Sequence, residues 1–261
     1  MQFYFAPNHY SSLKKLDLGM HEIVPLGQSI FKWVNRWLII PIFNFLGGFV
    51  ESYGIIILLL TILIKLVLTP LTYKSYLSMA KMKVLKPELD ELREKYGKDQ
   101  QRMSQEQMKL YRQAGVNPLG GCIPMLLQMP LLIAMYRFFP TSVELRQESF
   151  LWADDLSTYD AFINFGFTIP LLGDHLSLFT VLMTATSLLM VKMNAQMTNM
   201  GAGANQMKVL QYIFPVMLLF IFNNFASALT YYYLLFNLFS FGQQLLLKKF
   251  FINEDAILSL I

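Results

Sequence analysis

Five stretches of the chain are almost entirely apolar, and each is close to the length that a bilayer core requires. The first contains the run IIILLLTILIKLVL, and only the short segment NNF separates the fourth from the fifth. A helix needs about 20 apolar residues to cross the hydrocarbon core. The pattern therefore predicts an all-α polytopic membrane protein whose last two spans form a tight helical hairpin. We expect five transmembrane helices at residues 53–73, 118–139, 176–197, 208–223 and 226–247.

Polar residues inside these spans recur every three or four positions, so within each span they share one helical face. One interpretation is that they join neighbouring helices, because hydroxyl and amide side chains commonly bond across membrane helices. The other is that several stripes together line a hydrophilic groove. The stripe residues are Thr61, Lys65, Thr69 and Thr72 in the first span, Gln128 in the second, Ser177, Thr180, Thr184, Ser187 and Asn194 in the third, and Ser227, Thr230, Tyr233, Asn237, Ser240 and Gln244 in the fifth.

Lys65 is the only charged residue of the first span. A charge in hydrocarbon costs at least about 2.5–3.5 kcal/mol, so such residues usually face a bundle interior or a water-filled cavity. At 1.5 Å per residue, Lys65 lies about 13 Å from Lys74, which begins the following loop, so the ammonium could also snorkel toward the surface. The five spans contain no acidic residue that could pair with Lys65. Water, hydroxyls or a visiting anionic group remain as its partners.

The charges of the loops predict the orientation. Residues 74–115 carry ten Lys and Arg against six Asp and Glu, whereas residues 141–174 carry one against six. The first loop should be cytoplasmic and the second external, which leaves the N-terminus outside and the C-terminal tail, residues 251–261, in the cytoplasm. Residues 1–24 then resemble the end of an external domain. We expect the chain to be the C-terminal part of a longer protein whose leading span is absent.

Residues 25–49 precede the first span and mix Trp33, Trp37, Phe31 and Leu38 with basic residues. Aromatic and basic side chains beside an apolar face are typical of an amphipathic helix in the membrane interface. The alternative is a sixth span, but its uncharged part is short and contains a proline. We favour the interfacial helix.

The basic loop, residues 75–115, should form a charged two-helix hairpin. Residues 75–96 and 104–114 are rich in helix formers, and Gly97-Lys98-Asp99 separates them. The hairpin is either a solvated connector or a docking platform, since methionines give an adaptable apolar surface. The candidate docking residues are Met79, Met82, Lys83, Lys86 and Arg93.

Composition supports a membrane protein and argues against an enzyme. Hydrophobic residues make up 55% of the 261 residues and charged residues 15%, where a soluble domain carries about a quarter. We find no phosphate-binding glycine loop, no metal-ligand spacing among His and Cys, and no Ser/His/Asp set. We therefore expect no catalytic residue, no cofactor and no metal.

The segments NPLGGCIPMLLQMP, TPLTYKSYLSMAKM and SVELRQ strongly resemble the YidC/Oxa/Alb family of membrane protein insertases. The resemblance covers nearly all of residues 53–250 and implies a five-helix core around a groove. The positive charge on the family's first core span is normally an arginine. Lys65 stands at the matching position, so the charge is retained, while the bidentate hydrogen bonding of a guanidinium is lost. Thr61 and Tyr233 match other groove-facing positions, and the stripes add Gln128, Asn237 and Gln244.

The resemblance implies a membrane protein insertase and chaperone of the bacterial inner membrane that moves short polar client segments across without ATP. Expected partners are nascent membrane proteins and membrane lipids, with the ribosome, the signal recognition particle and its receptor, and the Sec translocon as further candidates. We expect a monomer and no DNA partner. A small-solute or ion transporter with Lys65 as its substrate site is the alternative, although no repeated half with broken helices is visible. A chromophore bound to Lys65 is a third, which lacks a carboxylate counter-ion.

Overall fold

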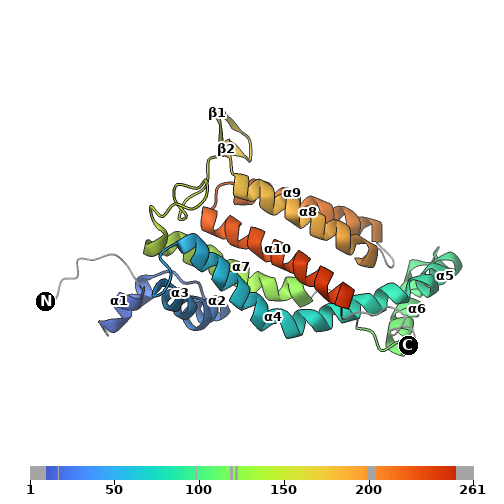
Figure 1. The fold of residues 1–261 in the computed structure, drawn as a ribbon. Helices are drawn as coiled ribbons and strands as arrows, with labels where there is room; N and C mark the ends of the chain where they lie inside the picture. The colour runs from blue at the N-terminus through green and yellow to red at the C-terminus, as the bar shows by residue number, and fades with distance from the viewer. Residues whose placement is uncertain are drawn as a thin grey trace. The chain divides into compact units, whose positions relative to one another are not determined.

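The computed structural model describes residues 10–16, 18–97, 99–117, 120, 123–198 and 204–250. The predicted tail, residues 251–261, lies outside these ranges, as do residues 1–9 and the start of the second predicted span. Within the described residues the protein is mostly helical, as predicted (Figure 1). Its longer helices are α4 (Tyr53–Val84), α5 (Lys86–Tyr96), α6 (Gln100–Gln113), α7 (Ile123–Thr141), α8 (Leu178–Thr198), α9 (Ala204–Phe222) and α10 (Ser227–Phe250).

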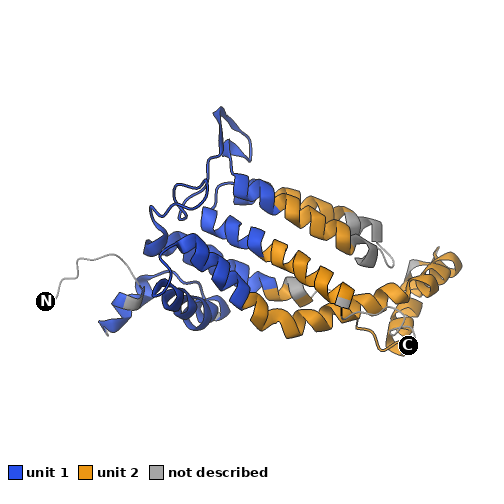
Figure 2. Cartoon of the chain, in the orientation of Figure 1, with its two compact units in different colours: residues 1–63, 128–183, 219–235 blue, residues 64–127, 184–218, 236–261 orange. Residues whose placement is uncertain are grey.

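The chain divides into two compact units (Figure 2). Unit 1 comprises Met1–Leu63, Gln128–Met183 and Leu219–Leu235, and unit 2 comprises Ile64–Leu127, Thr184–Leu218 and Phe236–Ile261. The helices α4, α7, α8, α9 and α10 each contribute one end to each unit. Unit 1 also holds the acidic loop between α7 and α8, and unit 2 holds α5 and α6.

Helix α4 is the longest helix of the predicted membrane region. Its 32 residues correspond to about 48 Å at 1.5 Å per residue, which is longer than a bilayer core of about 30 Å. Among the described helices, α4 is the one that is long and apolar enough to cross a membrane by length and composition. The segments Leu178–Asn194 and Val209–Phe222 are apolar but shorter. Helix α10 is long, but its polar stripe lowers its mean hydropathy. The total of five spans stays a prediction.

The amphipathic segment before α4 forms a nearly continuous helical stretch. It consists of α2 (Ser29–Val34), the π-helical turn η2 (Asn35–Ile39) and α3 (Ile40–Gly47). The buried amide of Asn35 donates to the carbonyls of Leu26 and Ala134 at 2.8 and 3.0 Å. In the π turn the backbone hydrogen bonds span five residues instead of four. The turn ends just before Pro41, which has no backbone N–H to donate in an ordinary helix. Trp33 and Trp37 are exposed, as a membrane-facing side requires.

The predicted helix at residues 75–96 is in fact two helices, because α4 ends at Val84 and α5 begins at Lys86. Pro87 explains the break, since its ring has no N–H to donate and clashes with the preceding turn. Asp99 then caps α6 by accepting from the backbone N–H of Arg102 at 3.0 Å. The helices α5 and α6 contact each other.

The expectation of an all-α protein was wrong in the acidic loop. Strands β1 (Ile163–Ile169) and β2 (Gly173–Leu176) pair antiparallel in unit 1, with Asn164 opposite His175. Alternating apolar and small or polar residues in β1, INFGFTI, are the strand signal in the sequence. The span prediction rests on long apolar runs, so it did not include this short segment with a period of two.

Candidate functional site

Lys65 lies on α4 within unit 2, and its side chain is buried. Only 8% of the residue is exposed. Its ammonium donates to the hydroxyl of Ser240 on α10, and it lies 3.4 Å from the ring centroid of Phe236, one turn earlier on the same helix. A cation over an aromatic face is attracted by the ring's electrons, most strongly where water is excluded. Two neighbouring positions of α10 therefore hold the charge that α4 carries into the apolar region.

The contact between α4 and α10 continues one turn further along both helices. The amide of Gln243 donates to the hydroxyls of Thr69 and Thr72 at 3.1 and 3.2 Å. The sequence stripes placed Thr69 and Thr72 on the face of Lys65 but missed Gln243. A signal existed, because Phe236, Ser240 and Gln243 follow steps of four and three and so share one face.

The adjoining side of α10 is bonded to α8 in unit 2. Asn237 donates to the hydroxyl of Ser187 at 2.7 Å, and Gln244 donates to the side-chain oxygen of Asn194 at 2.7 Å. Asn237 and Gln244 are seven residues, or two turns, apart, so they form one ladder. For these two predicted groove residues, the structure shows the helix-joining role that the sequence left open.

The remaining predicted groove residues belong to unit 1. Thr61 is buried and its hydroxyl donates to the carbonyl of Ile57 one turn back on α4, at 2.7 Å. Gln128 is buried on α7, and the partly buried ring of Tyr233 lies 6.1 Å from that of Phe222. Lys65, Asn237 and Gln244 thus lie in unit 2, where α10 contacts Lys65 through Ser240 and Phe236 and contacts α8 through Asn237 and Gln244. The other three predicted groove residues lie in unit 1.

No ion pair of Lys65 occurs among the residues that the structure describes. The ion pairs in that part of the chain include Lys32–Glu22, Arg102–Asp99, Lys109–Glu106 and His175–Asp174. The described part of the chain also contains no group of His, Cys, Asp and Glu that could hold a metal ion. Among the described residues, the ammonium of Lys65 is therefore stabilised by two neutral groups, a hydroxyl and an aromatic ring.

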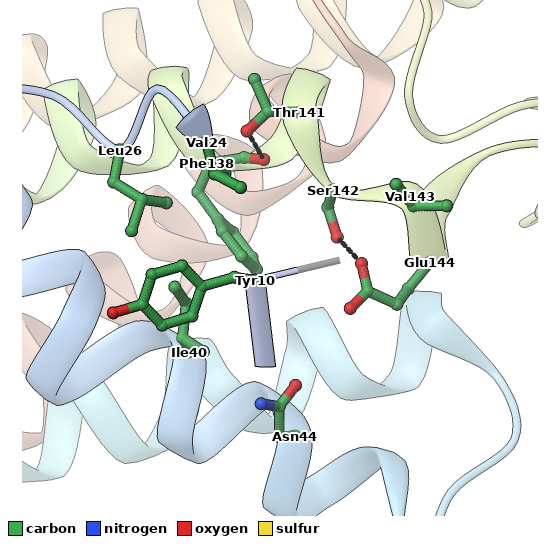
Figure 3. Close-up of a pocket in the computed structure, with 10 residues that line it drawn as sticks. All are labelled: Tyr10, Val24, Leu26, Ile40, Asn44, Phe138, Thr141, Ser142, Val143 and Glu144. Carbon is green, nitrogen blue, oxygen red and sulfur yellow. Dashed lines mark hydrogen bonds between the residues drawn. The ribbon is translucent and has the colours of Figure 1, made fainter. Parts of the chain in front are cut away.

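A separate pocket lies in unit 1, with an empty volume of about 320 Å³ that includes open solvent (Figure 3). Ser142 donates to Glu144 on its wall at 2.6 Å. None of the predicted site residues lines it. Its lining consists of Tyr10, Val24, Leu26, Ile40, Asn44, Phe138, Thr141, Ser142, Val143 and Glu144.

The predicted docking surface needs a correction. Met79 and Met82 are buried in a hydrophobic cluster of unit 2 that also contains Leu89 and Tyr111, so they are not an exposed adaptable surface. These methionines are buried because they lie on the face of α4 that packs against side chains of α5 and α6. Among the other candidates, Lys86 and Arg93 are exposed and Lys83 is half-buried.

The family can now be assigned. A family model described as 60Kd inner membrane protein matches residues 45–254. The chain belongs to this family. The resemblance predicted from the sequence motifs is thereby confirmed, and relatives in the 60Kd inner membrane protein family carry the name membrane protein insertase YidC.

The relatives agree over nearly the whole chain. The protein of that name from Amoebophilus asiaticus is 54% identical over 98% of this chain and 42% of its own length. The protein from Parabacteroides distasonis is 47% identical over 99% of this chain and 43% of its own length. This chain thus spans less than half the length of these relatives in the 60Kd inner membrane protein family.

A solved structure shows the same fold. A crystal structure titled active YidC insertase with the first transmembrane domain resolved superposes with a TM-score of 0.61 at 23% identity, covering 95% of this chain and 54% of that chain. At this identity the likeness concerns the fold.

Proposed function

We propose that this chain forms the membrane-embedded core of an insertase, with five spanning helices around a hydrophilic groove in the bacterial inner membrane. Membership in the 60Kd inner membrane protein family and the insertase name of its relatives support the proposal. The observation that carries it within the molecule is Lys65, a buried cation in an apolar helix with only neutral described partners.

Lys65 attracts an acidic or polar segment of a client protein. An ammonium has three N–H donors, and among the described residues one of them is used by Ser240. A client carboxylate then accepts from another N–H of the ammonium while the bond to Ser240 persists. A lysine attracts the carboxylate as a point charge, without the paired bonds of an arginine.

The hydrophobic part of the client supplies the driving force. The groove replaces part of the solvation that a polar segment would lose in lipid, which lowers the barrier to its passage. The apolar helix of the client then partitions into the bilayer without ATP. The membrane potential helps an acidic tail outward at about 2.3 kcal/mol per charge per 100 mV.

The cytoplasmic side receives the client. The excess of Lys and Arg in residues 74–115 supports a cytoplasmic position of α5 and α6, with the N-terminus outside and the C-terminus in the cytoplasm. Lys86 and Arg93 are then exposed cations, on a helix that also carries exposed carboxylates, for the ribosome, the signal recognition particle and its receptor, or the Sec translocon. The chain works as a monomer on nascent membrane proteins.

Reconstituted insertion tests this proposal. Purified protein in liposomes should insert a short client with an acidic tail, and Lys65→Met should slow that insertion at least tenfold. A charge pair at 4 Å contributes about 4 kcal/mol at an effective dielectric constant of 20, and about 1.4 kcal/mol corresponds to a factor of ten. Lys65→Arg should preserve insertion.

Lys74→Met is the matched control, because Lys74 is an exposed lysine on the same helix. A client whose tail acids are replaced by amides should respond little to Lys65→Met. Wild-type insertion of the acidic client by Lys65→Met would refute the charge mechanism. Solute flux through the liposomes without client insertion would instead favour the transporter.

A further inference from the structure

The β-hairpin of unit 1 is an exposed apolar element outside the predicted spans. Residues 161–173, AFINFGFTIPLLG, contain no charged side chain. Phe167 is 64% exposed and Leu171, in the turn, is 83% exposed, while Phe162 at the start of β1 is also exposed. A two-stranded hairpin is marginally stable in water by itself. These side chains therefore need a surface to cover them.

The strand β1 brings two aromatic side chains together. The rings of Phe165 and Phe167 lie 6.1 Å apart. The pairing with β2 shifts register between Asn164 and Ile169, and Gly166 in this stretch has a φ of 72°. The irregular stretch therefore presents Phe165 and Phe167 as one apolar patch.

The base of the hairpin is fixed to the helix ends of unit 1. His175 on β2 is buried, and one ring nitrogen bonds to the backbone oxygen of Asn223 at 3.0 Å. The side-chain amide of Asn223 donates to the carbonyls of Leu172 and His175, both at 2.8 Å. Within unit 1 the hairpin extends to the side of the first turns of α10 instead of continuing along that helix (Figure 2). It is a fixed arm beside helices that we propose end at the outer membrane surface.

We propose that this hairpin is a membrane anchor whose exposed apolar side chains enter the outer leaflet at the boundary of headgroups and acyl chains. Phe and Leu side chains are typical of the apolar face of segments that lie at that depth. A sideways arm at the external end of membrane helices runs along the bilayer surface. Residues 161–173 carry no charge, so this part of the arm offers no complementary pattern to a charged protein partner and no preference for anionic lipids. The exposed carboxylate of Asp174 lies outside this part, on β2. This inference rests on the proposed membrane placement of α4, α8 and α10.

Spin labels on the full chain in lipid nanodiscs test the anchor. Cys122 is the only cysteine of the chain, so Cys122→Ser gives the background for single cysteines. Labels at Phe167→Cys and Leu171→Cys should lie about 5–10 Å below the headgroups. They should be more accessible to oxygen than to a water-soluble nickel chelate. This depth should be equal in neutral and anionic nanodiscs.

Two further labels separate the anchor from the membrane placement itself. Leu66→Cys on the exposed side of α4 should be deep in the bilayer, and Asp154→Cys in the exposed part of the loop should be aqueous. Nickel access at Phe167 and Leu171 with a deep Leu66 overturns the anchor and leaves the membrane placement intact. Nickel access at Leu66 as well overturns both.

A protein occupant gives a different signal. Dipolar broadening between labels at Phe167 in separate chains identifies a second copy on the hairpin and overturns the anchor. Exclusion of both oxygen and nickel without broadening identifies another protein surface and also overturns it. The agreement of two positions, one in β1 and one in the turn, guards against a local disturbance by one cysteine.

Discussion

Asp160 holds the acidic loop of unit 1 to the start of α8, and its replacement should destabilise this region. The carboxylate is buried and accepts bonds from the hydroxyl of Ser177, the indole N–H of Trp152 at 2.9 Å, and the backbone N–H of Phe179 at 3.1 Å. Phe179 lies in the first turn of α8, where unpaired N–H groups and the helix dipole favour a negative charge.

The size of the effect follows from these three bonds. A bond to a charged group contributes about 1.5–3 kcal/mol and a neutral bond about 0.5–1.5 kcal/mol. Asp160→Asn keeps the shape and loses the charge, so about 1 kcal/mol per bond, or about 3 kcal/mol in total, should be lost. Asp160→Ala leaves the buried donors without an acceptor and should cost about 3–5 kcal/mol.

The assay is the apparent Tm in mild detergent, followed by size-exclusion chromatography of heated samples. About 2–4 °C per kcal/mol is expected for a domain of this size, so Asp160→Asn should lower the Tm by about 6–12 °C. Asp154→Asn makes the same chemical change at an exposed position of the same loop and should have little effect. Equal Tm values for the two variants would refute the reasoning, because the buried carboxylate would then contribute nothing beyond its shape.

Two further predictions concern the packing of α4 and the acid stability of the hairpin. A methyl group on Gly120 would lie 2.7 Å from the Cβ of Ser78, so Gly120→Ala should destabilise the protein by about 1–3 kcal/mol. Adding Ser78→Gly should restore part of the Tm, and no recovery would show that the crowding lies elsewhere. Bonding to the adjacent histidine ring lowers the pKa of Asp174. A lowered pKa stabilises the folded state above the unfolded value of about 3.9 and loses that effect as the pH falls through the folded value. The Tm difference between wild type and Asp174→Asn should thus be present at pH 7 and close as the pH falls below about 3.9 and through the lower folded value. A constant difference would contradict it.

The sequence by itself determined the helices and the unusual character of Lys65. A long apolar run is stable as a helix in lipid or in a protein interior. One charge inside such a run must then be buried against a polar or polarisable group. The helical period also assigned Thr69, Thr72, Asn237 and Gln244 to polar faces. Those properties are local, since each depends on residues within a few turns of one helix.

Tertiary structure decided which face meets which neighbour. Lys65 contacts Ser240, which is 175 residues away, and the adjacent residues Gln243 and Gln244 bond to α4 and α8 respectively. A helical period cannot distinguish these partners, because it defines a face and not the helix opposite to it. The burial of Met79 and Met82 has the same cause.

The acidic loop shows the same division. Its charge count predicted which side of the membrane it faces, but Asp160 is a buried acceptor at the start of α8 and not a solvated charge. Three donors from separate parts of the loop and helix converge on this carboxylate. Only the folded chain brings them within bonding distance, so the sequence determined the polarity of each segment and the tertiary structure determined its partners.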